Sequence, residues 1–219
     1  MIIQGSEEWF AERRGKATAS RIADIVAKTK SGYSASRANY MAQIISERLT
    51  GVTSESYSNA AMQWGIDTEP EARDAYSFHR DVDVAEVGFV VHPSIPMSGA
   101  SPDGMVGEDG MVEIKCPNTA THIDTLLSQK VPGKYNIQMQ WQMACCGSSW
   151  CDYVSYDPRL PEYMRLFVVR IDRDDEHIDM LQTEVKTFLD EVDNKIADLT
   201  RLYLPKERDP ADLHPLEAG

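Results

Sequence analysis

The stretch SPDGMVGEDGMVEIK, which runs from Ser101 to Lys115, decides the fold at the centre of this chain. Apolar residues flank Gly107-Glu108-Asp109-Gly110, whose glycines and acids are typical of a tight turn, so the stretch predicts a β-hairpin. Alternate side chains of a strand share one face, which places Glu113 and Lys115 together. The turn brings Asp103, which precedes the first strand, back beside them.

Two carboxylates and one ammonium on one face indicate a site for a hard cation. Burying these charges for structure alone is costly. In proteins Mg²⁺ is held by one or two carboxylates together with water and phosphate oxygens, and the ammonium would lie beside the attacking water or the phosphate. In the alternative interpretation, Asp103 is a turn residue and Glu113 and Lys115 form a surface pair. The pattern resembles the PD-(D/E)xK signature of metal-dependent nucleases, although so short a motif is weak when taken alone.

The segments on either side of the hairpin predict a single α/β domain over residues 1–219. Apolar residues at helical spacing mark the helices, and runs rich in Val and Phe mark the strands. With the PD-(D/E)xK resemblance, this order implies a restriction-endonuclease-like core, a central mixed β-sheet flanked by α-helices. We expect N-terminal helices within 6–80, a catalytic sheet core over about 84–171, a C-terminal helix over about 174–203 and a loose tail over 205–219. The individual helices are expected at 6–14, 18–26, 34–50, 69–78 and 134–147, and the strands at 84–91, 97–100, 105–106, 111–116, 152–156 and 163–171.

The net charge of −13 is unevenly distributed along the chain. Residues 1–50 carry eight Lys/Arg and five Asp/Glu, whereas residues 171–219 carry six and fourteen. Global charge bears on solubility and steering, so an acidic protein can still bind DNA through a locally basic groove. The N-terminus lacks the basic and apolar regions of a signal peptide, and no apolar run approaches the ~18 residues of a membrane span. We therefore expect a soluble, cytoplasmic protein that does not contact a membrane.

The four cysteines, Cys116, Cys145, Cys146 and Cys151, are expected to be reduced residues of the core. Some nucleases of this class hold an iron–sulfur cluster on four cysteines. Neighbouring side chains on a helix point about 100° apart, however, which disfavours a cluster that uses both Cys145 and Cys146.

Further motifs occur in order around the hairpin. They are Trp9-x3-Arg13-x-Gly15-x2-Thr18-Ala19-Ser20, Trp64-Gly65-x3-Glu69-x2-Ala72-Arg73, Ser101-Pro102-Asp103-Gly104, Glu113-Ile114-Lys115-Cys116-Pro117 and Gln138-Met139-Gln140. In this order they resemble the phage recombination exonucleases typified by phage lambda exonuclease, the YqaJ-type viral recombinase family of the PD-(D/E)xK superfamily. The resemblance spans residues 9 to about 170.

The resemblance implies a role for each matching residue of the metal site. The implied metal ligands are Asp103, Glu113, the backbone carbonyl of Ile114 and, near a second ion, Glu69. Lys115 would help to orient and deprotonate the attacking water, and Gln140 would line the site as a further catalytic residue. Two Mg²⁺ ions ~4 Å apart, for which Mn²⁺ would substitute, would stabilise the attacking and leaving oxygens.

The resemblance also implies a pocket for the 5′-terminal phosphate, formed by Arg13, Ser20 and Ser101. A guanidinium fork suits phosphate, and the first turn of a helix, where Ser20 is expected, offers unpaired N–H groups to anions. In the alternative interpretation, Ser20 is only a hydroxyl near a helix cap and Arg13 is only a surface arginine. Met62 is either an apolar wedge that separates the DNA strands or a core methionine.

The implied activity is 5′-to-3′ degradation of one strand of linear double-stranded DNA to mononucleotides. In this family the remaining 3′ overhang passes to a single-strand annealing protein, and members form a homotrimeric ring around DNA. We would then expect the protein to act in a bacterial host cell and to come from a phage or prophage. Two alternatives stay open: a sequence- or structure-specific endonuclease of the same superfamily, and a catalytically silent module that binds DNA ends or another protein.

Overall fold

The predicted hairpin forms the middle of a five-stranded mixed sheet in the computed structural model, which describes residues 2–53 and 60–204. The strand order is β10-β9-β8-β7-β4. The strands are β4 (Val84–Ala85), β7 (Gly104–Val106), β8 (Gly110–Lys115), β9 (Trp150–Tyr156) and β10 (Leu166–Asp172). Within this sheet, among the residues that the structure describes, β8 and β9 pair in parallel and the other neighbouring strands pair antiparallel. A parallel pair needs a long crossover, which here contains α5 (Thr119–Ser128) and α6 (Gly133–Cys146).

A second, three-stranded sheet corrects the expectation of one strand over 84–91. That segment divides between β4 of the large sheet and β5 (Val90–His92), which pairs with β6 (Ile95–Ala100), and β6 pairs in turn with β1 (Ala17–Thr18). The side chain of Gln4 donates to the carbonyl of Val87 between the two strands. Gly88 lies so close to the backbone of Ile2 that a side chain there would collide with it. The N-terminal segment therefore crosses the chain where it passes from one sheet to the other.

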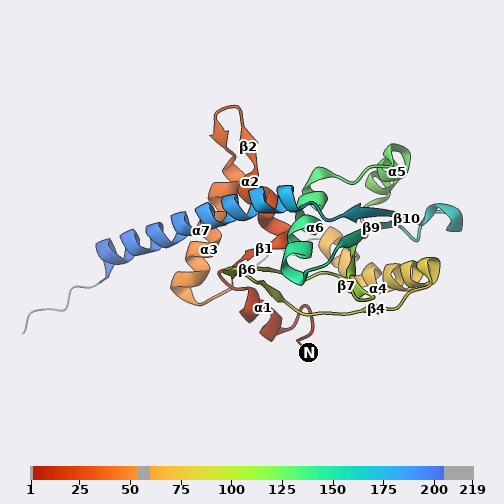
Figure 1. Ribbon diagram of the computed structural model, residues 1–219, viewed down its shortest axis with the longest axis horizontal. Coiled ribbons are helices and arrows are strands. Elements are labelled where there is room, and N and C mark those ends of the chain that lie inside the picture. The colour runs from red at the N-terminus through yellow and green to blue at the C-terminus, as the bar shows by residue number, and fades with distance from the viewer. Residues whose placement is uncertain (1, 54–59, 205–219) are drawn as a thin grey trace, which may run out of the picture.

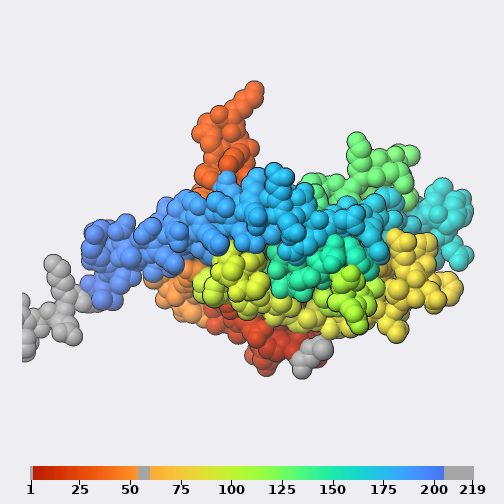
Figure 2. Space-filling model, in the orientation of Figure 1, coloured from red at the N-terminus to blue at the C-terminus, as the bar shows by residue number. Residues whose placement is uncertain are grey.

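Helices α1 (Glu7–Arg13) and α3 (Ala35–Thr50) begin and end at the residues that the capping signals predict, whereas the helix predicted over 18–26 opens as a 3₁₀ turn. Helix α1 is capped by Ser6, whose hydroxyl accepts from the N–H of Trp9. Helix α3 ends at Gly51 in the left-handed conformation. Between them lie the 3₁₀ turn η1 (Ala19–Arg21), α2 (Ile22–Val26) and an unpredicted hairpin of β2 (Lys28–Thr29) and β3 (Gly32–Tyr33). This hairpin stands clear of the surrounding surface (Figures 1 and 2).

Helix α4 (Ala60–Arg80) is longer than expected, because the predicted start at residue 69 is wrong. Pro70 favours the first turn of a helix, where its missing N–H costs nothing, and this suggested a start there. In the structure Pro70 lies inside the helix. Ala72 and Tyr76, which follow Pro70, are buried in a core cluster shared with β8 and β9, whereas the turns before Pro70 are mostly exposed. Pro70 therefore removes one backbone hydrogen bond without ending the helix.

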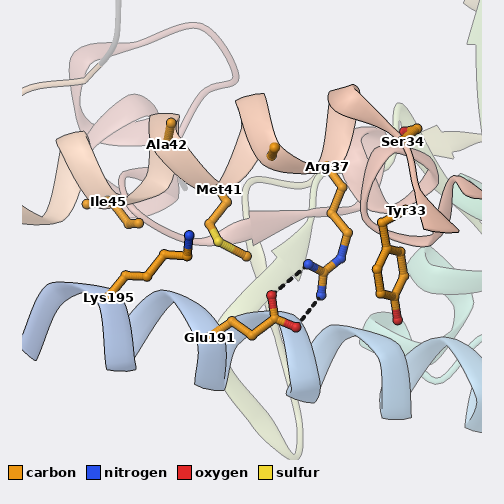
Figure 3. A pocket seen from close by; sticks show the side chains of 9 residues that line it. Tyr33, Ser34, Arg37, Met41, Ala42, Ile45, Glu191 and Lys195 are labelled. Carbon is orange, nitrogen blue, oxygen red and sulfur yellow. Dashed lines mark hydrogen bonds and ion pairs between the residues drawn. The ribbon is translucent and has the colours of Figure 1, made fainter. Parts of the chain in front are cut away.

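The closing helix α7 (Asp175–Tyr203) confirms the predicted amphipathic pattern. Its buried face packs with α2, α3 and α6 and consists of Ile178, Leu181, Val185, Phe188, Leu189 and Val192. Arg37 of α3 makes a two-armed ion pair with Glu191, at 2.7 and 2.9 Å (Figure 3). The pair borders a hollow of about 250 Å³ between the two helices. The remaining element is the 3₁₀ turn η2 (Glu162–Met164), and the tail predicted over 205–219 lies outside the described residues.

The cysteines Cys116, Cys145, Cys146 and Cys151 form no disulfide with one another, and each is buried or half-buried, which is the core position predicted for them. No helix in residues 2–53 or 60–204 combines the length and the apolar character needed to cross a membrane.

Candidate active site

The hairpin brings Asp103 and β8 together at the open end of the pair formed by β7 and β8. Pairing of the two strands ends at Gly104 and Val112, so β8 continues past its partner. At that point the backbone N–H of Ile114 donates to Oδ2 of Asp103 at 2.6 Å. The N–H and C=O of one strand residue point to the same side. The carbonyl of Ile114, a predicted metal ligand, therefore faces the side on which the Asp103 carboxylate lies.

Glu113 is fully buried, and side chains hold both of its carboxylate oxygens. Its Oε1 is paired with the ammonium of Lys115 and accepts from Nε2 of Gln138 at 2.6 Å. Its Oε2 accepts from Nε2 of Gln142, also at 2.6 Å. Glu113 and Lys115 therefore share one face of β8, as the period of the strand predicts, and α6 covers that face.

The structure corrects the placement of Gln140. Its amide donates to the carbonyl of Asp172 and accepts from the N–H of Asp174, both at 2.9 Å, so it braces the turn between β10 and α7. Two residues along a helix rotate a side chain by about 200°, whereas four bring it back to nearly the same face. Gln138 and Gln142 therefore point together toward Glu113, and Gln140 points away. This rotation is the signal in the sequence that would have identified the two glutamines of the site.

Glu69 reaches the site from α4 and is held by Arg73 one turn further along. Arg73 Nη2 lies 2.7 Å from Oε1 of Glu69, and its other arm pairs with Glu86. Burial raises the pKa of Glu69, although Arg73 opposes the rise. The sequence analysis did not assign Arg73 a role, although the i, i+4 spacing of Glu69 and Arg73 in the motif predicts such a pair.

The site carries more negative charge than its own cations balance. Burial, and next the nearby Glu113, raise the pKa of Asp103 well above its usual range. Burial lowers the pKa of Lys115, but Glu113 and Asp103 raise it by more, so the net shift is upward. Glu69 and Glu113 thus act on Asp103 as like charges, and Glu113 acts on Glu69 in the same way.

A divalent cation fits this surplus of charge, because hard oxygen donors and closely spaced carboxylates are what Mg²⁺ uses. Within the described ranges, no group of three or more His, Cys, Asp or Glu side chains is arranged to hold a metal ion. A site here would therefore rely on a few carboxylates, with the Ile114 carbonyl and water completing the shell.

One cavity of about 630 Å³ joins two of the carboxylates, Glu69 and Asp103, to residues predicted for phosphate binding, whereas Glu113 and Lys115 are not on its wall. The predicted site residues on its wall are Arg13, Ser20, Met62, Glu69 and Asp103. Ser101 joins this group through its hydroxyl, which accepts from Nη1 of Arg13 at 3.0 Å and from Nε1 of Trp9 at 2.9 Å. Arg14, Lys16, Arg21 and Arg73 also line the cavity, so with Arg13 its wall carries five cations, against the four acids Glu47, Glu69, Glu86 and Asp103.

Arg13 is a poorly solvated cation whose hydrogen-bond acceptor is the neutral hydroxyl of Ser101. Its guanidinium carbon lies 4.1 Å from the centre of the Trp9 ring. Burial lowers the pKa of Arg13 to about 10, although Tyr40 and Glu47 act in the opposite direction. An anion beside this guanidinium would relieve the burial cost of its charge.

Ser20 and Met62 lie on the cavity wall in settings that differ from the expectations. Ser20 lies in the 3₁₀ turn η1, not in the first turn of an α-helix, so its contribution rests on its exposed hydroxyl. Met62 is 48 % exposed, which excludes the interpretation as a core methionine.

Comparisons with known proteins identify the family of this chain and proteins that share its fold. The sequence profile described as YqaJ-like viral recombinase domain matches residues 8–149. LHK-Exo, whose crystal structure contains dAMP, is 52% identical to this chain in sequence. The match covers 91% of this chain and 98% of LHK-Exo, and the TM-score is 0.86. LHK-Exo is also represented by a second structure, described as an alkaline exonuclease from Laribacter hongkongensis, with 51% identity, the same coverage and the same TM-score.

A phage-related exonuclease from Haemophilus somnus 129PT shares the fold, with 17% identity, coverage of 84% of this chain and 96% of that protein, and a TM-score of 0.70. A comparison with curated proteins gave no match. The α/β fold with mixed sheets flanked by helices is thus that of exonuclease structures. The profile match over residues 8–149 shows that the chain belongs to the YqaJ-like viral recombinase family.

Proposed function

We propose that this protein is a Mg²⁺-dependent 5′-to-3′ exonuclease that degrades one strand of linear double-stranded DNA to mononucleotides. The observation that carries the proposal is the single cavity whose wall holds Arg13 and Ser20 together with Glu69 and Asp103. A basic pocket for a terminal phosphate beside a carboxylate site for a divalent cation is what cleavage near a DNA end requires.

The metal site in this proposal uses Asp103, Glu113 and the carbonyl of Ile114, with Glu69 near a second ion, and Mn²⁺ substitutes for Mg²⁺. Bound divalent cations would activate the attacking water and stabilise the charge on the leaving oxygen. Lys115, held beside Glu113, donates hydrogen bonds that orient the water and the scissile phosphate. Arg73 keeps the Glu69 carboxylate in place.

The direction of degradation follows from which end of the strand the cavity binds. Arg13, Ser20 and Ser101 would bind the phosphate at the 5′ end, so that the next phosphodiester lies at the carboxylates. Cleavage there releases one nucleotide and leaves a new 5′-phosphate. LHK-Exo, at 52% identity, was crystallised with dAMP, and a bound mononucleotide supports a product of that size. Exposed Met62 on the cavity wall would part the strands as an apolar wedge.

The biological setting that we propose follows from membership of the family. A single-strand annealing protein would take up the 3′ overhang for homologous recombination, and the exonuclease would act as a homotrimeric ring in the cytoplasm of a bacterial host, encoded by a phage or prophage.

One assay tests the activity and its direction. Linear duplex labelled at either the 5′ or the 3′ end of one strand, and covalently closed circular duplex, are incubated with Mg²⁺ or with EDTA. We expect Mg²⁺-dependent release of the 5′ label as a mononucleotide before the 3′ label, with the circle intact. Cutting of the circle would instead show an endonuclease, and binding without cleavage would show a silent DNA-binding module.

A further inference from the structure

Two glutamine amides, one helical turn apart on α6, hold the two oxygens of Glu113. Nε2 of Gln138 lies 2.6 Å from Oε1, and Nε2 of Gln142 lies 2.6 Å from Oε2. The two residues differ in position. Gln138 shares its oxygen with Lys115, whereas Gln142 is fully buried and holds the other oxygen.

We propose that Gln142 is a positioning residue that fixes Glu113 for metal binding. The Gln142 amide holds Oε2 of Glu113, and the other oxygen, Oε1, is thereby kept on the side of Lys115. Gln142 is fully buried and its amide donates to Glu113, so it acts through Glu113 and not by touching DNA. This assignment deepens the proposed function and rests on it for the identity of the metal.

Burying the amide group of Gln142 costs free energy, and packing alone does not explain why a glutamine occupies this position. Its Oε1 is buried, and no hydrogen-bond partner for it occurs in the described part of the chain. A buried polar atom without a partner is destabilising, and an apolar side chain of similar length would avoid that cost. What the amide supplies at this position is a donor to a buried carboxylate, and hydrogen bonds to charged acceptors are the stronger kind.

The orientation of the carboxylate is the property that depends on this bond. Rotation about the last bond of Glu113 would exchange or tilt its two oxygens. With Gln138 alone, one oxygen is fixed and the other is free to move, whereas two donors from one rigid helix fix the plane of the carboxylate. Outer partners that orient a metal ligand in this way typically change metal affinity or activity by about 10–100-fold when they are removed.

The test compares Gln142→Met with Gln140→Met. Both substitutions replace a buried glutamine of α6 by an unbranched apolar side chain of similar length, but only Gln142 contacts Glu113. We expect Gln142→Met to weaken Mg²⁺ binding to the DNA-free protein about tenfold by calorimetry and to lower kcat with KM for DNA unchanged. Gln140→Met is expected to keep wild-type Mg²⁺ affinity, whatever it does to the melting temperature. If Gln142→Met does not fold, Gln142→Asn, which withdraws the amide by one methylene, should show the same loss.

Wild-type Mg²⁺ affinity and kcat in folded Gln142→Met would overturn the assignment, and so would equal losses of affinity in the two Met variants. Failure of the proposed function is distinguishable from these results. A wild-type protein that binds Mg²⁺ but does not cut DNA, with affinity still lowered by Gln142→Met, would refute the exonuclease and leave the assignment of Gln142 standing.

Discussion

The carboxylate of Asp103 accepts a hydrogen bond from the backbone N–H of Ile114, with 2.6 Å between Oδ2 and N. This bond replaces the strand pairing that β7 no longer supplies to β8 beyond Val112. The carboxylate thus has a structural role and also lies near Glu113, whose charge disfavours its ionised form. A single residue therefore closes the hairpin and introduces repulsion into the site.

Asp103→Asn is expected to stabilise the metal-free protein at alkaline pH. The pKa of Asp103 in the folded protein lies well above its usual range, so the folded state binds the proton more tightly than the unfolded state. Stability is then lost as the pH rises from about 4 through the folded pKa. Asn keeps an acceptor for Ile114 but carries no charge. We expect the melting temperature in EDTA at pH 8 to rise by about 2–4 °C, which corresponds to ~1 kcal/mol, with little difference near pH 4. A variant that melts at or below the wild-type temperature at pH 8 would contradict this.

Lys115→Met is expected to lower DNA cleavage by at least about a thousandfold, because it removes the cation that orients the water and the phosphate. Release of mononucleotides from 5′-phosphorylated linear duplex in Mg²⁺ measures the effect. Binding of the same duplex in Ca²⁺ should stay within a fewfold of wild type, because the cations on the cavity wall are unchanged. Turnover near the wild-type rate would remove Lys115 from the mechanism.

Arg73→Met is expected to raise the Mg²⁺ concentration needed for half-maximal cleavage by about tenfold. Arg73 lowers the pKa of Glu69 against the effect of burial, so its loss would favour the protonated, non-binding form of that carboxyl. Arg73→Lys keeps the charge but loses the fork that contacts both Glu69 and Glu86. The Mg²⁺ concentration that it needs should therefore lie between those of the wild type and Arg73→Met. An unchanged Mg²⁺ dependence in Arg73→Met would show that Glu69 does not need its partner.

The parts of the fold that the sequence predicts are those that depend on local signals. The turn at residues 107–110 and the period of two along β8 suffice for the hairpin, and Gly51 suffices for the end of α3. The division of residues 84–92 between two sheets depends on contacts with the distant N-terminal segment, which no local pattern reveals. The start of α4 is ambiguous in the sequence, because Pro70 suits the first turn of a helix but lies inside this one.

The sequence predicts the candidate site only in part, for a similar reason. The motifs predict which residue types belong to the site, and five of the predicted residues line one cavity. A motif does not by itself state which of its residues faces inward, and for Gln138-Met139-Gln140 the choice of Gln140 was wrong for that reason. The helical rotation of about 100° per residue would have favoured Gln138 with Gln142.

The assembly prediction is a trimer with about three times the 24.6 kDa mass of the chain. A ring with cyclic symmetry would enclose the duplex and keep the enzyme on it between cuts. Light scattering at micromolar concentration measures the mass directly. If only the monomer is seen, the ring and its account of processivity must be abandoned, whereas the active-site predictions are unaffected.

The preference for a 5′-phosphate tests the part of the cavity that distinguishes this family within its superfamily. Arg13 is a partly buried cation that donates to the neutral hydroxyl of Ser101, and burial lowers its pKa to about 10. A terminal phosphate would give it an anionic partner, and charge-assisted hydrogen bonds of this kind contribute about 1.5–3 kcal/mol each. The wild-type enzyme should therefore degrade 5′-phosphorylated ends at least about tenfold faster than 5′-hydroxyl ends.

Arg13→Ala should lose most of that preference by slowing the reaction on phosphorylated ends alone. Its Mg²⁺ dependence should stay that of the wild type, because Arg13 does not contact the carboxylates in the described structure. Ser101→Ala removes the hydroxyl that holds Arg13 and should cause a smaller loss of the same kind. Initial rates on the two end types, for the wild type and both variants, provide the measurement. Each new 5′-phosphate produced by a cut would draw the strand forward by one nucleotide, so Arg13→Ala should also dissociate after fewer cuts. Equal wild-type rates on the two ends, or a preference that survives Arg13→Ala, would place the phosphate pocket elsewhere.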